Sequence, residues 1–325
     1  MKSNEDSFKM RRGANVETPY ESVVRDGVTW GLSSAAEALS PDQPVESSSG
    51  DRSSPSAVML PRQVTWLSLF CSPWSRRWKW VLLVGVVAGA LLYWLAQVSS
   101  SVVVSLIQSF VLSVTVPAAM LCLFVEWDVS RRVAIPDALL TALAGVGIAS
   151  VAALLNGAFG ISEKNAMWAA AVEEPCKGLV LLVLAMRAQR FPGILSGLAL
   201  GCAVGAGFAV IETIGYGYAY GTETSPSIDV FVLRGLLAPF MHAAWTGALG
   251  GALWAARGVN GSLWSMFRSP FGWLVLGGMM LCHAAWNAAW LWPVLCLVSW
   301  TALFHYVGRG IKQAFEENLV AKEFS

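Results

Sequence analysis

Eight long apolar segments dominate the sequence after residue 78. They lie near residues 79–98, 101–125, 138–157, 166–186, 193–215, 231–256, 271–288 and 290–308. About 20 consecutive apolar residues span the hydrocarbon core of a bilayer, and the segment must be helical because lipid offers the backbone no hydrogen-bond partners. A composition of 55% hydrophobic and 13% charged residues is likewise typical of a membrane protein. The sequence therefore predicts an all-α, polytopic membrane protein with about eight transmembrane helices over residues 79–308.

The first sixty residues have a different composition. They hold nine acidic and six basic side chains, are rich in Ser, Pro and Glu, and show no apolar periodicity. Such a segment cannot bury enough apolar surface to fold, so we expect residues 1–60 to be a disordered polar tail. Tryptophans near the first span, at positions 66, 74, 78 and 80, favour an interfacial segment over residues 61–78. Residues 309–325 are expected to be a C-terminal cytoplasmic tail.

Basic residues are distributed unequally between the two ends of the predicted spans. Thirteen Lys and Arg residues fall on one side, and only Lys164 and Arg234 lie near the short loops of the other. Because positive loops stay cytoplasmic, both termini are expected inside, in a multi-pass protein of the plasma membrane. The sequence contains no stripe of basic residues of the kind that binds nucleic acid, so no nucleic-acid partner is expected. The apolar spans make the lipid bilayer the expected surroundings of the protein.

Few ionisable side chains lie within the predicted spans away from their ends. The acids are Glu173, Glu174 and Glu212, and two of the chain's three histidines, His242 and His283, lie in the sixth and seventh spans. A charge near the bilayer centre costs about 2.5–3.5 kcal/mol on insertion scales, so such residues usually have a function. With a rise of about 1.5 Å per residue, all five fall in the outer half of the membrane or near its midplane. Four helices are thus expected to bring these side chains together.

Residue spacing suggests roles for the adjacent glutamates. Glu173 and Lys177 are four residues apart and share a helix face, so we expect them to form an ion pair. Glu174 is rotated by about 100° from Glu173, which leaves it as the candidate general base that activates water. Which of the two glutamates is the base stays open at this point. Pro175 is expected to loosen the helix beside them.

Four short motifs in these spans resemble those of the PrsW-type intramembrane proteases. They are Glu173-Glu174-Pro175-Cys176-Lys177 (EExxK), Phe208 and Glu212 in "GFAVIET" (FxxxE), His242 in "MHAAWTG", and His283 with Asn287 in "HAAWN" (HxxxN). The motifs occur in order over residues 166–288, each on its own span, and the resemblance does not cover residues 1–78. The wider group includes the CAAX prenyl proteases and bacteriocin-immunity proteases. The prenyl-protease branch has His in the second motif, where this chain has Glu212, so the PrsW branch is favoured.

The resemblance implies a peptidase that cleaves a membrane-anchored protein, such as a single-span anti-sigma factor, in the outer half of the bilayer. The residues expected to take part in catalysis are Glu173, Glu174, Glu212, His242, His283 and Asn287, with Lys177 and Phe208 as structural partners. Glu174, Glu212, His242 and His283 are the candidate ligands of a divalent metal such as zinc. Asn287 is a candidate donor to the developing oxyanion. The chemistry is left open between a glutamate-dependent and a metal-dependent mechanism.

Two other classes of function compete with the peptidase. A transporter can have a cavity lined by Glu, Lys and His, but it would be expected to show internal repeats, and the sequence shows no such symmetry. A non-catalytic scaffold or chaperone subunit of the same superfamily would be favoured by loss of the paired glutamates. This chain has Glu173, Glu174 and Glu212, so the sequence favours the peptidase over the scaffold.

Overall fold

The computed structural model describes residues 77–128, 132–186, 191–222, 226–237, 241–257, 263–288 and 292–323. The predicted polar tail over residues 1–60 lies outside these ranges, as does the predicted interfacial segment except for its last two residues. Within the described ranges every regular element is helical, which confirms the all-α fold class.

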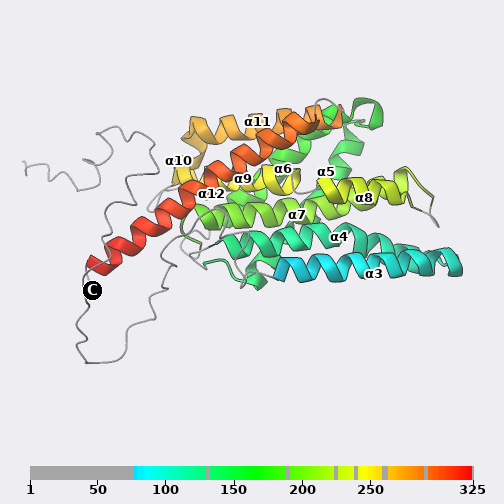
Figure 1. The fold of residues 1–325 in the computed structure, drawn as a ribbon. Helices are drawn as coiled ribbons and strands as arrows, with labels where there is room; N and C mark the ends of the chain where they lie inside the picture. The colour runs from blue at the N-terminus through cyan, green and yellow to red at the C-terminus, as the bar shows by residue number, and fades with distance from the viewer. Residues whose placement is uncertain are drawn as a thin grey trace, which may run out of the picture. The chain divides into compact units, whose positions relative to one another are not determined.

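The helices follow one another with short connections, and Figure 1 shows α3, α4 and α7 lying side by side. In chain order the elements are α3 (Arg77–Ser99), α4 (Val102–Trp127), α5 (Ile135–Ala158), the 3₁₀ helix η1 (Glu163–Trp168), α6 (Ala169–Ala185), α7 (Ile194–Ala219), α8 (Ile228–Leu237), α9 (His242–Arg257), α10 (Leu263–Arg268), α11 (Pro270–Asn287) and α12 (Trp292–Glu323).

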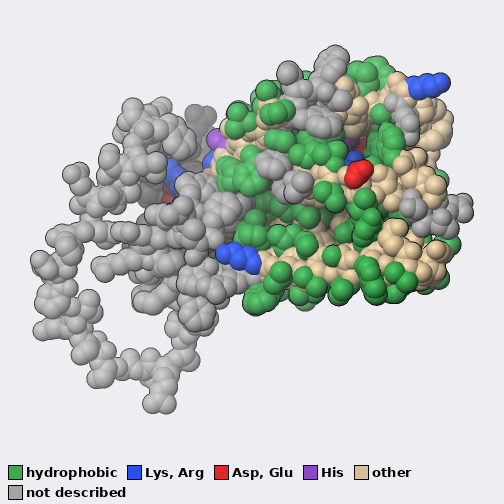
Figure 2. All heavy atoms as spheres, turned by 45° about the vertical axis from the view of Figure 1, so that its right-hand side comes forward, with side chains coloured by type: hydrophobic (Ala, Val, Ile, Leu, Met, Phe, Trp, Pro, Cys, Tyr) green, Lys and Arg blue, Asp and Glu red, His purple; other side chains and the backbone are tan. Residues whose placement is uncertain are grey.

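Helix α7 is central among the described helices and contacts α4, α5, α9 and α12. All of its residues from Ile194 to Val210 are buried, whereas α3 has one buried residue, Gly89. The two helices have the same mean hydropathy of 2.2 in their most apolar stretches. Hydropathy therefore predicts that both cross the membrane but does not distinguish the central helix from a peripheral one. Figure 2 shows a face on which hydrophobic side chains predominate over charged ones, as expected of a surface against lipid.

Glycines set the distance between α7 and α9. At Gly197, Gly201 and Gly205, an added Cβ would collide with main-chain carbonyl oxygens of α9, at Gly250, Thr246 and His242 respectively. Small residues at such spacing let two membrane helices approach until their backbones touch. The first residue of α9, His242, is thus held directly against the backbone of α7.

Among the described residues, five helices are long and apolar enough to cross a membrane, which is in keeping with a multi-pass membrane protein. They are Arg77–Ser99, Val102–Glu126, Ile135–Ala158, Ile194–Ala219 and Pro293–Glu317. The predicted fourth and seventh spans correspond to α6 and α11, with 17 and 18 residues, and most of the sixth corresponds to α9, with 16. The count of eight spans and the cytoplasmic position of both termini stay predictions.

The predicted sixth span, residues 231–256, is not one helix. It comprises α8 and α9, and α9 begins at His242. The sequence has Pro239 between them, in a stretch outside the described residues, and proline lacks the N–H that a continuous helix requires. His242 therefore begins a helix instead of lying in the middle of one. The predicted depth of His242 near the membrane midplane assumed a continuous helix, so that depth no longer follows.

The last helix is longer than the predicted span, because α12 continues to Glu323. Glu317 accepts a hydrogen bond from Gln313, four residues before it, at 3.0 Å, which supports the helix beyond the apolar stretch. Arg132 forms an ion pair with Glu317 at 2.6 Å, and the backbone N–H of Ile194 donates to Gln313 at 3.0 Å. Most of the predicted C-terminal tail is thus helical and is tied to the start of α7.

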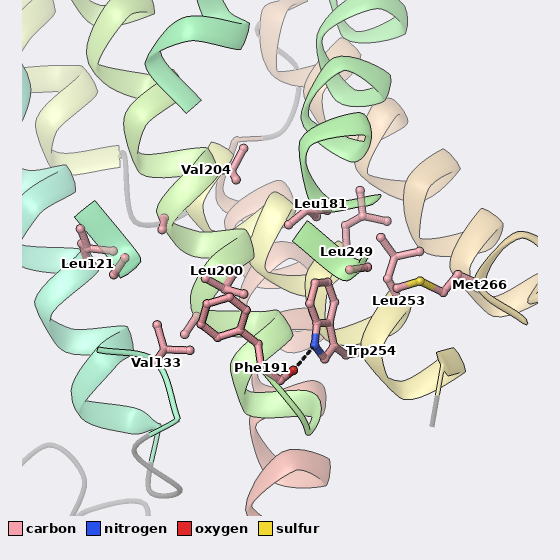
Figure 3. Packing of buried hydrophobic residues seen from close by; sticks show 14 residues of the cluster. Leu121, Val133, Leu181, Phe191, Leu200, Val204, Leu249, Leu253, Trp254 and Met266 are labelled. Carbon is pink, nitrogen blue, oxygen red and sulfur yellow. Dashed lines mark hydrogen bonds between the residues drawn. The ribbon is translucent and has the colours of Figure 1, made fainter. Parts of the chain in front are cut away.

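A buried apolar cluster joins α4, α6, α7, α9 and α10 (Figure 3). Within it, the indole N–H of Trp254 donates to the carbonyl oxygen of Phe191 at 2.7 Å, and Leu200 and Leu249 lie nearby. Burial of side chains of this size stabilises a fold by about 1.5–3 kcal/mol each in water. The cluster fixes α9 against the start of α7 and so supports the position of the residues described next.

Candidate metal and catalytic site

The predicted site residues come together among four helices. Glu173, Glu174 and Lys177 are on α6, Phe208 and Glu212 on α7, His242 on α9, and His283 and Asn287 on α11. Lys177, His242 and His283 have no exposed side-chain surface, and Glu174 is 1% exposed. Buried ionisable side chains such as these must form hydrogen bonds or ion pairs with one another, because an unpaired charge away from water is costly.

The ion pair on α6 joins different residues from those predicted. Lys177 Nζ lies 2.5 Å from Glu174 Oε1, three residues away, and not against Glu173. Glu173 instead accepts a hydrogen bond at Oε1 from Asn156 Nδ2 of α5 at 3.0 Å. Residues three and four apart both share a helix face, so spacing alone could not distinguish the two pairings. The predicted pair of Glu173 and Lys177 is wrong.

The Glu174–Lys177 pair also contacts both histidine rings at Nδ1. Glu174 Oε1 lies 2.7 Å from His283 Nδ1, and Lys177 Nζ lies 2.7 Å from His242 Nδ1. The ammonium group of Lys177 is 4.3 Å from the centre of the Phe208 ring, a cation–π contact. The Glu174–Lys177 ion pair thus contacts both imidazole rings at their Nδ1 atoms and orients them.

The opposite edges of the rings face the other two glutamates. His242 Nε2 contacts Glu212 Oε2, and His283 Nε2 lies 3.7 Å from Glu173 Oε2. Within the described part of the chain, His283 Nε2 and Glu173 Oε2 are buried and have no hydrogen-bond partner. A bound ion or water could satisfy both atoms, although they are not unique in this respect, because Glu174 Oε2 and Thr246 Oγ1 also lack a partner among the described residues.

These four residues have a donor set that suits a metal. One ligand atom from each of Glu173, Glu212, His242 and His283 lies within 4.8 Å of the others. Two imidazoles and two carboxylates are ligands that zinc accepts. The sequence proposed Glu174 in this set, but the structure places Glu173 there, because Glu174 is engaged at the Nδ1 edge.

The two histidines fit a cation to different degrees. His283 places Nδ1 against the Glu174 carboxylate, which leaves Nε2 free to ligate. For His242, the ammonium of Lys177 can only donate, so Nδ1 accepts and the Nε2 proton faces Glu212. Binding of a cation at Nε2 of His242 therefore requires that proton to leave Nε2, and if it moves to Nδ1 the donation from Lys177 is lost.

Trp245 supports the histidines, although it was not among the residues predicted for the site. Its ring stacks on His283 with centroids 5.0 Å apart and meets His242 edge-on at 5.2 Å. The indole N–H donates to Ser299 Oγ of α12 at 2.7 Å, which fixes the ring. The signal was available, because the tetrapeptide His-Ala-Ala-Trp occurs at both His242 and His283.

Arg234 was considered only as a basic residue of the outer side, yet it touches the site from α8. Its Nη2 donates to Glu212 Oε2 at 2.7 Å, and its Nε donates to Thr213 Oγ1 at 3.1 Å. The guanidinium lies 4.6 Å from the centre of the Tyr216 ring. Its charge at the start of the predicted sixth span was the only sequence signal, and it did not indicate a contact with Glu212.

Asn287 lies one turn beyond His283, as predicted, but its amide has another partner. Asn287 Nδ2 donates to the carbonyl oxygen of Ala166 in η1 at 3.0 Å. This bond ties α11 to the segment that precedes α6. The arrangement supports a role in positioning α11 and does not point the amide nitrogen at a substrate.

Comparison with known proteins gives one finding. A protein-family model described as "PrsW family intramembrane metalloprotease" matches residues 131–308, more than half of the chain. The matched region contains every residue of the site described above. No curated protein and no solved structure matches the sequence.

Proposed function

Since the chain belongs to the PrsW family of intramembrane metalloproteases, we propose that it cleaves a membrane-anchored protein in the outer half of the bilayer. The observation that carries this proposal is the buried group of Glu173, Glu212, His242 and His283, whose ligand atoms converge. Family membership favours the peptidase over the transporter and the scaffold. Single-span anti-sigma factors are the proposed substrate class, and the plasma membrane, with both protein termini cytoplasmic, the proposed location.

We further propose that Glu212, His242 and His283 hold a divalent metal such as zinc. Catalytic zinc sites generally use three protein ligands and leave one position open. A cation at such a site acts as a Lewis acid and makes water a nucleophile at neutral pH. Glu174 and Lys177 contribute by holding the Nδ1 edges of the two rings.

Glu173 is the proposed general base, in place of Glu174. Glu173 Oε2 is buried, has no hydrogen-bond partner among the described residues, and faces His283 at 3.7 Å. A carboxylate in this position can accept a proton from the attacking water as the water oxygen bonds to the scissile carbonyl carbon. The same carboxyl group then returns the proton to the amide nitrogen, the C–N bond breaks, and an acid and an amine leave.

N-terminal proteomics on membranes of the source cells tests the proposal. Cells with the natural protein are compared with cells carrying Glu173→Gln or His283→Ala at equal level. We expect new N-termini near the outer end of specific single-span proteins to disappear in both variants. Glu126→Gln is the matched control, because Glu126 contacts the backbone of Arg77 and lies outside the site. Unchanged profiles under several stresses would refute peptidase activity at these residues.

A further inference from the structure

Arg234 is a cation bonded to a proposed metal ligand, and none of the four motifs includes it. Its Nη2 occupies Glu212 Oε2, the same oxygen that contacts His242 Nε2. A divalent cation held by Glu212 and His242 would lie close to this guanidinium. Like charges at such distances repel strongly when both are partly removed from water.

The position of Arg234 is set by the packing of α8 on the end of α7. The backbone N–H of Ser227 donates to the carbonyl oxygen of Gly217 at 2.9 Å. A Cβ at Gly217 would collide with the ring of Phe231, so the ring lies directly on the α7 backbone. Phe231 and Arg234 are three residues apart and share a face of α8, which aims Arg234 at Glu212 and Thr213.

Arg234 removes one of the excess negative charges of the site, but the three carboxylates still outnumber the two cations by one. Glu173, Glu174 and Glu212 supply three carboxylates. Lys177 is paired with Glu174, and Arg234 is paired with Glu212. With Arg234 in place, the site carries one negative charge fewer than Glu173, Glu212 and the two histidines would carry without it. The site therefore attracts a divalent cation less strongly.

We propose that Arg234 competes with the metal for Glu212 and thereby regulates how tightly the site is loaded. This inference rests on the proposed metal site. In the absence of metal the guanidinium neutralises Glu212, and on loading it withdraws from Oε2. Arg234 is suited to this movement because its side chain is 13% exposed and stands on a ten-residue helix, whereas Lys177 is fully buried on α6.

The test is the affinity of the full-length protein, purified in detergent, for Zn²⁺ or Co²⁺. Bound metal is measured by equilibrium dialysis with elemental analysis for the natural protein, Arg234→Gln and Arg234→Lys. We expect Arg234→Gln, which removes the charge, to bind the metal about tenfold more tightly or better. Arg234→Lys keeps the charge and should stay within about threefold of the natural protein by the same reasoning.

A further variant reaches the same contact without removing the arginine. Thr213→Val deletes the hydroxyl that accepts from Arg234 Nε. Loss of one hydrogen bond of this kind loosens the guanidinium and should tighten metal binding about threefold. This variant keeps the inference testable if Arg234→Gln fails to fold, which the thermal unfolding midpoint of each variant reports.

The outcomes separate this inference from the proposed function. Binding by the natural protein that is lost in His283→Ala, together with tighter binding by Arg234→Gln and Thr213→Val, supports the competition. If the natural protein binds and these two variants bind equally or less tightly, the competition is overturned and the metal site stands. If Arg234→Lys tightens binding as much as Arg234→Gln, charge is not the cause and the inference fails. No binding by any variant overturns both.

Discussion

The two edges of the His283 ring differ in how closely a glutamate faces them, although Glu174 Oε2 also has no hydrogen-bond partner among the described residues. At the Nδ1 edge, Glu174 and Lys177 provide close partners at 2.5–2.7 Å for each other and for both rings. At the Nε2 edge, Glu173 and His283 face each other at 3.7 Å, beyond hydrogen-bonding distance. A satisfied edge fixes geometry, whereas an unsatisfied one is available for chemistry. Adjacent glutamates in one motif thus have different surroundings, and we expect different consequences when each is changed.

Removing the cation of the satisfied edge should have the largest effect. Lys177→Met leaves Glu174 buried without its main partner, and we expect the free energy of unfolding to fall by about 3–5 kcal/mol. Chemical unfolding in detergent measures this loss. The double variant Glu174→Gln with Lys177→Met removes both charges and should recover part of the stability. A Lys177→Met protein as stable as the natural one would contradict the importance of this ion pair.

Substitution of Glu173, the proposed base, should lower activity without lowering the stability of the fold. Glu173→Gln keeps an oxygen that can accept from Asn156 but cannot take a proton from water. We expect kcat to fall at least about 10²-fold with little change in the unfolding midpoint. Hydrolysis of a reconstituted single-span substrate measures kcat. The assignment of Glu173 would be wrong if Glu174→Gln, and not Glu173→Gln, abolished activity while leaving stability intact.

Substitution of Trp245, which contacts both histidine rings, should have a smaller effect on activity. Trp245→Phe keeps a ring against His283 but loses the bond to Ser299, and we expect activity to fall on the order of tenfold. The matched control is Trp273→Phe, which loses a similar bond to the Phe267 carbonyl on an exposed face of the same bundle. Equal effects of the two substitutions on kcat would show that Trp245 does not position the histidines.

The smallest expected effect is that of Asn287→Ala. Loss of the hydrogen bond to the Ala166 carbonyl should lower the free energy of unfolding by about 0.5–1.5 kcal/mol, with a similarly small change in kcat. Parallel unfolding and hydrolysis assays separate the two quantities. A loss of kcat of about 10²-fold or more at unchanged stability would instead restore Asn287 as a donor to the oxyanion.

The sequence predicted the helical class and the meeting of four motifs, because both follow from local patterns. Long apolar segments predict membrane helices, and ionisable residues within them require partners. Spacing could not resolve which glutamate pairs with Lys177, since the three- and four-residue steps both bring side chains to one face. Hydropathy was also uninformative about α7 and α3, whose most apolar stretches have equal values and whose burial is opposite.

The remaining parts of the site depend on contacts between residues distant in the chain. Asn156, Arg234 and Trp245 reach the site from α5, α8 and α9. Nothing in the local sequence of α5 or α8 indicates such a contact. The separate start of α9 at His242 was missed because the apolar pattern continues across Pro239, although the proline itself was a signal for interruption.

The glycines of α7 have a consequence for how the protein responds to its lipid environment. Bilayers differ in thickness, and a helix on the periphery adapts to them by tilting. Helix α3 has a mostly exposed surface but packs closely on α4 at Gly85 and Gly89, so we expect it to tilt together with α4. The backbone contact between Gly205 and His242 leaves no compressible side chain between the two helices, so we expect such tilting to change the spacing of the candidate site little. We therefore expect the geometry of the candidate site to change little between membranes of different thickness.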